Sequence, residues 1–480
     1  MKTRKMDSKS FLRTIFTIIL DNAHWFMKMK GGNGQTSNTT TSHKKYGQGP
    51  TSMKWIYGRD EFPPWPRSLI YGFQWAIIFL PTLMILSTIS SEYLGIHGAE
   101  KILFFQRILL ISGGGMILQT LWGHRYPLLE GPSSALLLSF IILAPQGVPV
   151  IQGGMIAGGF FLVFLSIFKL MKYLEPLFTD NVIGVILILI AITLLPYLAP
   201  MMIGQRPGYP NGEPLVFGIS LTVMITIALF SHWLPGFPKT ISLFLGVLLG
   251  TFLSGALGRL GVSGVREALW LSFPSSLFFG LPSFSLSATL TFLAAYVAVI
   301  INAVGSIYGI GEILGKEGIT ERVNRGIGIT GLGGFAAGAF GVIGTVSFGF
   351  SPGVVLVTRV GSRFTVTVCG FFLLSLAFLQ KFLAVLAVIP ASVVGAAMII
   401  GLAAQIGAGI SVLTRSGREL EGRDYLVVGI PILMGGIVSI LPEGFFQAFP
   451  SGVHALLKNG LVVGIVLVLG LEHLFLRLRK

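Results

Sequence analysis

The chain has 480 residues, of which 53% are hydrophobic and only 11% charged, and its mean hydropathy is +0.81. This composition excludes the ordinary soluble classes, and about fourteen apolar stretches of roughly 17 to 23 residues are each long enough to cross the ~30 Å hydrocarbon layer as a helix. We therefore predict an all-α polytopic membrane protein, because lipid-facing backbone must satisfy its own hydrogen bonds and the stretches lack the alternation of a porin strand.

The formal net charge of +15 does not predict a nucleic-acid partner, because the positive charge is concentrated at the start of the chain. Residues 1–67 hold 12 of the 34 Lys and Arg residues against four acids. This excess is typical of a cytoplasmic segment under the positive-inside rule. With fourteen spans that start inside, fifteen more basic residues fall on cytoplasmic connections and the C-terminus, and seven fall at outer ends. We predict a protein of the cell membrane with both termini cytoplasmic.

Residues 1–67 are predicted to form a basic tail and linker. The segment "SFLRTIFTIILDNAHWFMK" is too short to span and is interrupted by Arg13, which favours a basic amphipathic segment on the membrane surface over a signal peptide. The polar stretch "GGNGQTSNTTTSHKKYGQGPTS" predicts a linker that does not fold by itself. Met53 is an alternative start.

Two of the predicted spans are short, and each follows a helix breaker. They are the third, in "LLEGPSSALLL" (residues 128–138), and the tenth, in "GFSPGVVLV" (residues 349–357). Matching interrupted segments in two halves are typical of inverted-repeat transporters, whose substrate lies near the midplane between half-helix N-termini. We therefore predict a 7+7 inverted repeat; kinking or close packing is the other interpretation of each break. The spans begin near Ser68, Leu103, Ser133, Val150, Val182, Pro214, Pro238, Leu286, Val323, Pro352, Phe364, Leu383, Asp424 and Gly460.

Four segments are similar to motifs of one transporter family. "YGRDEFPPWPRSLIYGFQWAI" looks like the start of its span one, with Gln74 in place and Trp75 where a histidine is usual, and "RYPLLEGPSSALL" like its span-three pattern, which here includes Gly131 and Pro132. "NRGIGITGLGGFAAGAFG" is similar to its glycine-rich span nine. "FSPGVVLVTR" falls on its span-ten signature, where Gly353, Thr358 and Arg359 match. From about Tyr57 onward, the sequence thus resembles the nucleobase-ascorbate transporter family of uracil, xanthine and purine permeases.

The chain departs from that family at two positions. The resemblance implies one substrate-binding glutamate that opens the span-ten signature and a second in span eight. Here Phe350 and Ser351 open the signature, and Asn302 stands in "IINAVGSIYG", where Gly305 is retained. The resemblance implies a core domain of residues 68–175 (spans one to four) and 286–382 (spans eight to eleven). It implies a gate domain of residues 176–285 (spans five to seven) and 383–480 (spans twelve to fourteen).

The resemblance implies a planar nucleobase as the ligand. Such a ligand needs a few polar groups in an apolar cleft and an aromatic surface on which to stack. The alternatives are phenylalanines that face lipid or core, and an Asn302 that makes only an interhelical hydrogen bond. The predicted substrate-binding residues are Asn302, Phe350, Ser351, Phe348, Gly349, Ser133 and Gln74. Those with a structural role in the motifs are Gly353, Thr358, Arg359, Gly305, Gly131 and Pro132.

Glu130 is the candidate group for proton coupling. An ionisable residue beside a break inside the membrane is a functional candidate by default, and a half-helix N-terminus favours its negative charge. A structural salt link is the alternative. Glu312 is predicted to be solvated near a cytoplasmic end, and Arg359 and Arg363 are assigned to topology and snorkelling.

No enzyme, metal site or cofactor is predicted. "GIGITG" (residues 326–331) matches the dinucleotide glycine pattern, but no βαβ unit surrounds it and close helix packing explains the glycines. The sole cysteine, Cys369, lies in an apolar span, and the seven histidines are scattered. We thus predict no catalytic residue and no metal ligand.

Three functions follow in order of preference. The first is a permease for purines, xanthine or uracil, working by alternating access of core against gate, with proton symport favoured over facilitated diffusion. The second is a small-anion exchanger of the related sulfate transporter fold, which the missing carboxylates favour. The third is a receptor or scaffold that acts through the basic tail. The partners are then the nucleobase, the lipid bilayer and a proton, and a homodimer is left open.

Overall fold

The computed structural model describes residues 55–261, 263–274, 280–414 and 420–476. The expectations for the amphipathic segment, the linker and Met53 lie outside this part of the chain.

Long apolar helices make up most of the molecule, which confirms the polytopic helical prediction. In the described chain, eight helices are long and apolar enough to cross a membrane. They are α2 (Trp65–Tyr93), α3 (Gly98–Leu121), α5 (Val148–Ile167), α7 (Asp180–Ile203), α8 (Pro214–Trp233), α12 (Leu286–Leu314), α17 (Ala391–Leu413) and α18 (Gly422–Ile440). The count of fourteen spans stays a prediction.

The other helices complete the bundle, and all of them except the 22-residue α13 (Ile319–Phe340) are shorter than those eight. α15 (Arg363–Ala377) and α16 (Gln380–Ala387) meet at 89° and together pass the same test as one bent span. The twelfth span was predicted from near Leu383, but that residue lies in α16, and the long helix α17 begins only after Pro390. The remaining helices are α4 (Ser134–Leu143), α6 (Met171–Leu174), α9 (Phe237–Thr240), α10 (Ser242–Ala256), α11 (Ser263–Glu267), α13 (Ile319–Phe340), α14 (Ser351–Thr358), α15 (Arg363–Ala377), α16 (Gln380–Ala387), α19 (Glu443–Phe446), α20 (Ser451–Lys458) and α21 (Gly460–Gly470).

A two-stranded ladder lies at the centre of the helices, which the all-α prediction did not include. β1 (Glu130–Pro132) runs antiparallel to β2 (Thr345–Ser347), with Gly131 opposite Val346. β1 leads into the ten-residue helix α4 and β2 into the eight-residue helix α14. A side chain at Gly131 would collide with Phe79 of α2, so glycine lets the ladder lie against that helix.

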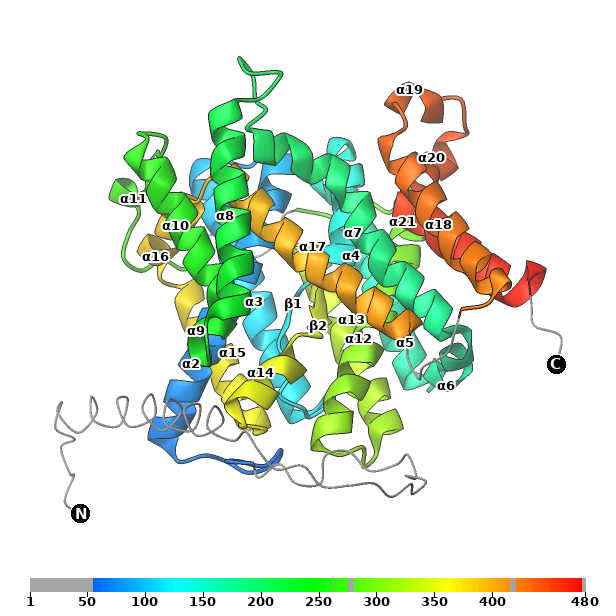
Figure 1. The fold of residues 1–480 in the computed structure, drawn as a ribbon, viewed down its shortest axis with the longest axis horizontal. Coiled ribbons are helices and arrows are strands. Elements are labelled where there is room, and N and C mark those ends of the chain that lie inside the picture. Colours follow the sequence, from blue (N-terminus) through cyan, green and yellow to red (C-terminus); the bar gives the residue numbers. More distant parts are fainter. Residues whose placement is uncertain (1–54, 262, 275–279, 415–419, 477–480) are drawn as a thin grey trace, which may run out of the picture.

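The helices pack as two groups. α2, α3, α5, α13 and α15 pack mainly against one another, and α7, α8, α10, α17, α18 and α21 form a second group, in which α17 lies between α7 and α8 (Figure 1). α12 packs against α5 and α13 of the first group and also against α20 and α21. Glycines allow α5 and α13 to approach closely: a Cβ at Gly331 would lie 2.7 Å from the carbonyl oxygen of Gly159.

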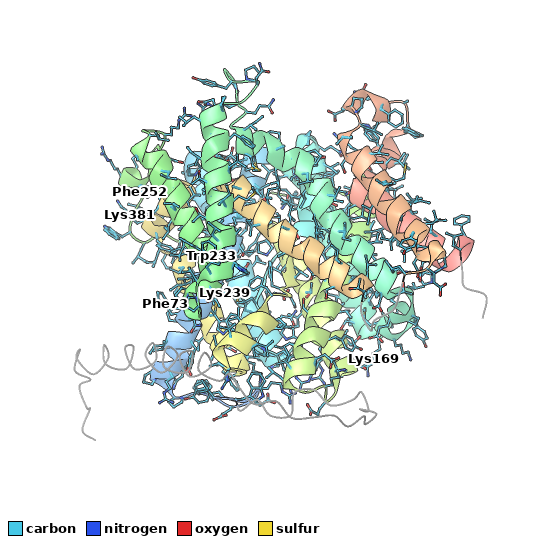
Figure 2. The ribbon with its side chains drawn as sticks, in the orientation of Figure 1. Phe73, Lys169, Trp233, Lys239, Phe252 and Lys381 are labelled. Carbon is cyan, nitrogen blue, oxygen red and sulfur yellow. The ribbon has the colours of Figure 1, made fainter. Side chains whose placement is uncertain are left out.

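The outside of the bundle carries large apolar side chains. Phe73 of α2, Trp233 of α8 and Phe252 of α10 are exposed and project from the surface of the helices (Figure 2). An aqueous surface rarely carries so many large apolar groups, whereas a bilayer covers them at no cost.

The segment before α2 is fixed to the end of α14. Tyr57 and Val360 form a parallel bridge, and the Ile56 N–H donates to the Arg359 carbonyl at 3.0 Å. Asp60 accepts hydrogen bonds from Arg59 at 2.9 Å and from Arg363 at 2.8 Å. Burial alone would raise the pKa of Asp60, but these two arginines outweigh it and hold the pKa below its ordinary value of 3.8.

Candidate functional site

An open surface lies where α12 passes the start of α14. On α12, Asn302 is half-buried and Gly305 is exposed, while Gly349, Phe350 and Gly353 at the start of α14 are exposed. No atom of the described chain lies within 4 Å of where a Cβ of Gly305 or Gly353 would be. The glycines thus leave free space on each helix, and these five predicted site residues lie on α12 and at the start of α14, which pack against each other.

A row of three phenylalanines runs from the core to this surface. The rings of Phe79 and Phe348 are 5.2 Å apart at 73°, and those of Phe348 and Phe350 are 5.5 Å apart at 56°. Phe79 is fully buried, whereas Phe350 is 40% exposed. Packing against Phe348 therefore holds Phe350 from behind and leaves part of the ring accessible.

The two predicted serines face the interior. The Ser351 hydroxyl is buried and accepts a hydrogen bond from the Leu129 N–H at 3.1 Å, so it holds the chain just before β1. Ser133 is also buried, and its backbone N–H donates to the Gly344 carbonyl at 2.9 Å. The structure does not bring either side chain to the surface around Phe350.

The backbone near the start of α14 has fewer free donors than expected. The Ser351 N–H donates to the Phe348 carbonyl at 3.2 Å, and the Gly353 N–H donates to the Phe350 carbonyl at 3.0 Å. Pro352 has no N–H and occupies the first turn of α14, where none is needed. The donors left to consider are therefore the N–H groups of Gly349 and Phe350.

Glu130 lies inside the core, behind the ladder. It is fully buried and accepts hydrogen bonds from Ser347 Oγ at 2.7 Å and Thr330 Oγ1 at 3.3 Å. Gln119 Nε2 in turn donates to Thr330 Oγ1 at 3.1 Å. The carboxyl group is thus enclosed between α3, α13 and β2 and does not belong to the Phe350 surface.

Sequence reasoning did not identify Gln119 and Thr330 as partners of Glu130. Both are buried polar residues of long helices, and an uncharged polar side chain in the interior of a membrane protein must find a partner. That signal is present in the sequence, but it does not say which partner.

The remaining motif residues support the site from further away. Gln74 is half-buried on α2, five residues before Phe79, while Trp75 is buried and its Nε1 donates to Thr365 Oγ1 at 3.1 Å. Thr358 Oγ1 donates to the Val354 carbonyl at 2.9 Å, so it closes the last turn of α14.

Arg359 ends the same helix with a left-handed backbone, φ 58°. Its own N–H donates to the Val355 carbonyl at 2.8 Å. Within the described residues there is no group of three His, Cys, Asp or Glu side chains that would hold a metal ion.

The apolar helices and the two short helices α4 and α14, each after one strand of the central ladder, fit a class of protein, the membrane transporters with a 7+7 inverted repeat. The structure is similar to the transmembrane domain of the cyanobacterial bicarbonate transporter BicA, with a TM-score of 0.55 and 16% identity over 78% of this chain and 95% of that one. This likeness supports the fold.

The sequence places the chain within that class. The model of the Permease family named Xan_ur_permease matches residues 66–444, so the chain belongs to this family and is a transporter, not an enzyme. The chain is 26% identical to the uric acid transporter UacT of Escherichia coli, over 83% of each chain. It is 24% identical to the xanthine permease of Bacillus subtilis, over 83% of this chain and 91% of that one.

Proposed function

We propose that this permease carries an oxidised nucleobase, a purine or pyrimidine with ring carbonyls, across the membrane. The observation that carries the proposal is the accessible ring of Phe350 at the start of the short helix α14, which packs against α12, the helix that carries the half-buried Asn302. A base would stack on Phe350 and place its polar edge toward Asn302, whose amide both donates and accepts hydrogen bonds. The relatives named for uric acid and xanthine support this substrate class.

The N-terminal end of α14 favours the carbonyl side of such a base. The helix dipole places partial positive charge there, and the N–H groups of Gly349 and Phe350 are the nearest backbone donors. A carbonyl oxygen is a better partner for them than an exocyclic amine. Uric acid, xanthine and uracil therefore fit the surface better than adenine does.

Transport would proceed by movement of the core domain against the gate domain. The division of the helices into two groups supports this proposal. Several hydrogen bonds connect the core and gate domains. Among them, Tyr93 Oη donates to the Tyr197 carbonyl at 2.6 Å, and Asn459 Nδ2 donates to Ser139 Oγ at 3.1 Å. Movement of the core against the gate would require both of these bonds to break.

Glu130 is the proposed proton-coupling group, although it does not contact the substrate surface. Its partner Ser347 also ties the ladder to α12, because the Ser347 carbonyl accepts from Ser306 Oγ at 3.0 Å. A proton on Glu130 would change the hydrogen bonding of β2 and, through Ser306, the position of α12 beside the base. The coupling would thus pass through the ladder.

The test is uptake of radiolabelled uracil, xanthine, hypoxanthine and urate by cells that lack their own permeases, with sulfate and bicarbonate in parallel. We expect uptake of at least one oxidised base, and Asn302→Ala should raise its KM about tenfold, the value of one buried hydrogen bond. Gln447→Ala, on an exposed residue after α19, is the matched control. Uptake of bicarbonate or sulfate alone would replace this proposal with an anion exchanger.

A further inference from the structure

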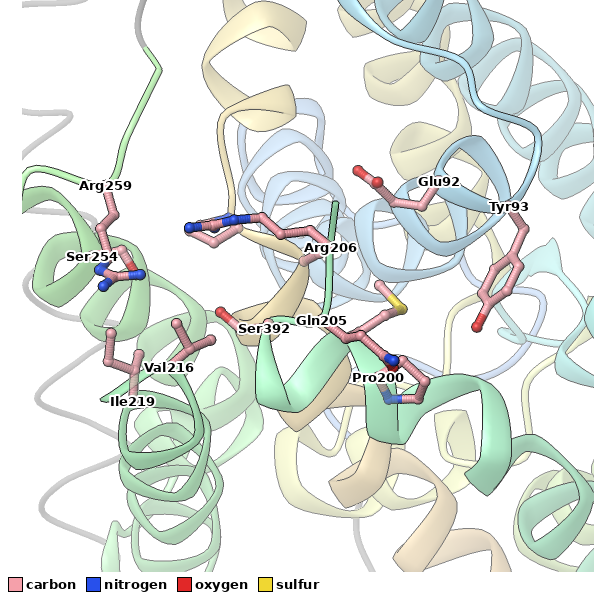
Figure 3. Close-up of a pocket in the computed structure, with 14 residues that line it drawn as sticks. Glu92, Tyr93, Pro200, Gln205, Arg206, Val216, Ile219, Ser254, Arg259 and Ser392 are labelled. Atoms are coloured by element: carbon pink, nitrogen blue, oxygen red, sulfur yellow. The ribbon is translucent and has the colours of Figure 1, made fainter. Parts of the chain in front are cut away.

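A cavity of about 360 Å³ lies away from the Phe350 surface, where α2 ends between helices of the other group. The C-terminal end of α2 contributes Glu92, the chain after α7 contributes Arg206, and the residues after α10 contribute Arg259 (Figure 3). The Phe350 row meets α2 at Phe79, near the middle of that helix, whereas the cavity lies at its C-terminal end. Under the predicted topology, the cavity opens to the outside.

Glu213 connects the two arginines of this cavity. Its Oε1 is 2.7 Å from Arg206 Nη2, and its Oε2 is 2.6 Å from Arg259 Nη2. The hydrogen bond from Arg259 is the main reason that the pKa of Glu213 lies below its ordinary value. One carboxylate thus holds two guanidinium groups near one another and neutralises only one of them.

The cavity keeps an excess of positive charge. Glu92, the other carboxylate, pairs with Lys101 at 3.4 Å, so three cations accompany two carboxylates. Each guanidinium has five N–H donors, of which the contacts with Glu213 use only a part. The side chains of Arg206 and Arg259 are 52% and 30% exposed, so their remaining donors are accessible to a ligand.

The walls suit a flat ligand of this charge. Met201, Ile219 and Pro390 provide apolar surface in the lining, and the volume falls within the range of about 300 to 1,000 Å³ that small-molecule pockets occupy. Guanidinium groups bind two oxygens in one plane and stack on conjugated rings. A monoanionic oxopurine such as urate combines these features, whereas sulfate uses only the charge.

We propose that this cavity is an outer binding site that holds an anionic oxopurine before it reaches the surface at Phe350. The inference rests on the proposed function, since it concerns the same substrates. The two sites differ in place and in chemistry. The outer site would bind the base through the charge and the planar guanidinium groups of its arginines, and the inner site through stacking on Phe350 and the amide of Asn302. The outer site would raise the local concentration of substrate at the entrance.

The test is the KM for urate uptake from outside, with uracil as a neutral comparison. We expect Arg206→Gln and Arg259→Gln each to raise the KM for urate about threefold to tenfold. Each variant removes one charge-assisted hydrogen bond to urate that is partly exposed to solvent. The uptake rate at saturating urate and the KM for uracil should stay unchanged. Arg259→Lys should restore part of the loss, because it keeps the charge without the planar fork. Lys458→Gln is the matched control, because it removes one positive charge from α20, near Glu443 and outside the cavity.

Several results would overturn the inference. Unchanged KM in both glutamine variants would exclude the outer site. If the glutamine variants lower the uptake rate at saturating urate and also weaken the efflux of urate from inside, the arginines have a structural role. Inhibition of urate uptake by sulfate as strong as by unlabelled xanthine would indicate a site for any anion. A wild-type protein that carries no nucleobase would instead reject the proposed function, and this inference with it.

Discussion

At the scale of single residues, Phe350 is the side chain on which most of the proposed substrate contact depends. Phe350→Ala should raise the KM for the transported base about fivefold to a hundredfold, because one stacking contact is worth about 1 to 3 kcal/mol. Phe350→Tyr should keep most of the affinity. The measurement is concentration-dependent uptake, with Phe371→Ala, an exposed position on α15, as the control. Equal KM values for Phe350→Ala and wild type would show that the base does not stack there.

Glu130 has a different role at the same scale, because it is enclosed in the core. Glu130→Gln keeps the shape of the side chain. Its amide oxygen can accept from one of the two hydroxyl groups, Ser347 Oγ or Thr330 Oγ1, and its NH2 group can donate to the other. We expect the variant to lose accumulation driven by a pH gradient while base exchange across the membrane continues. Proteoliposomes loaded with unlabelled base measure both. If exchange and accumulation fall together, Glu130 is structural and the proton binds elsewhere.

At the scale of elements, the crossing of α5 and α13 depends on the absence of side chains. Gly331→Ala would place a Cβ 2.8 Å from the backbone nitrogen of Val163 and from Leu162 Cβ, and neither atom can rotate away. We expect a loss of about 1 to 3 kcal/mol of stability, which is typical of overpacking. The readout is the temperature at which half of the detergent-solubilised protein leaves the monodisperse peak.

The matched control for that crossing is Gly114→Ala in α3. No described atom lies within 4 Å of its Cβ position, so the change should be neutral or stabilising by up to about 1 kcal/mol, from helix propensity. A Gly331→Ala variant as stable as Gly114→Ala would mean that the two helices separate without cost.

The sequence predicted the short helices, but it did not predict which way the polar side chains beside them face. Pro132 and Pro352 indicated two short helices, and α4 and α14 are indeed short. The direction of Ser351 was not predictable, because a serine at a helix start serves a ligand or the preceding loop equally well. Glu130 faces inward because of its register with Ser347, and the three-residue ladder that sets this register has no strand signal of its own.

The predicted start of the twelfth span was wrong for a similar reason. The run "FLAVLAVIP" is apolar throughout, so hydropathy does not indicate where α16 ends and α17 begins, which depends on the geometry at Pro390.

At the scale of the whole molecule, Asp60 connects the chain before α2 to the start of α15. Its pKa is lower in the folded protein than in the unfolded chain, so its contribution to stability is fully present above the unfolded pKa and is lost as the pH falls through the folded one. Asp60→Asn should therefore lower the melting temperature by the same amount at pH 6 and pH 8. Below about pH 4, the difference in melting temperature between the variant and the wild type should shrink.

Melting of purified protein across this pH range measures the effect, with Glu100→Gln at the start of α3 as a control outside these contacts. A difference that changes between pH 6 and pH 8 would point to another titrating group as the origin of the effect.

The ladder between β1 and β2 also governs how the protein is made. Glu130 and Ser347 are 217 residues apart, so the ribosome completes β1 and α4 long before their partner strand exists. α4 is only about 15 Å long, half of the hydrocarbon thickness, and cannot hold its place in a bilayer by itself. The edge of β1 therefore stays unpaired until β2 has been synthesised, and the ladder forms only when both halves of the chain are present.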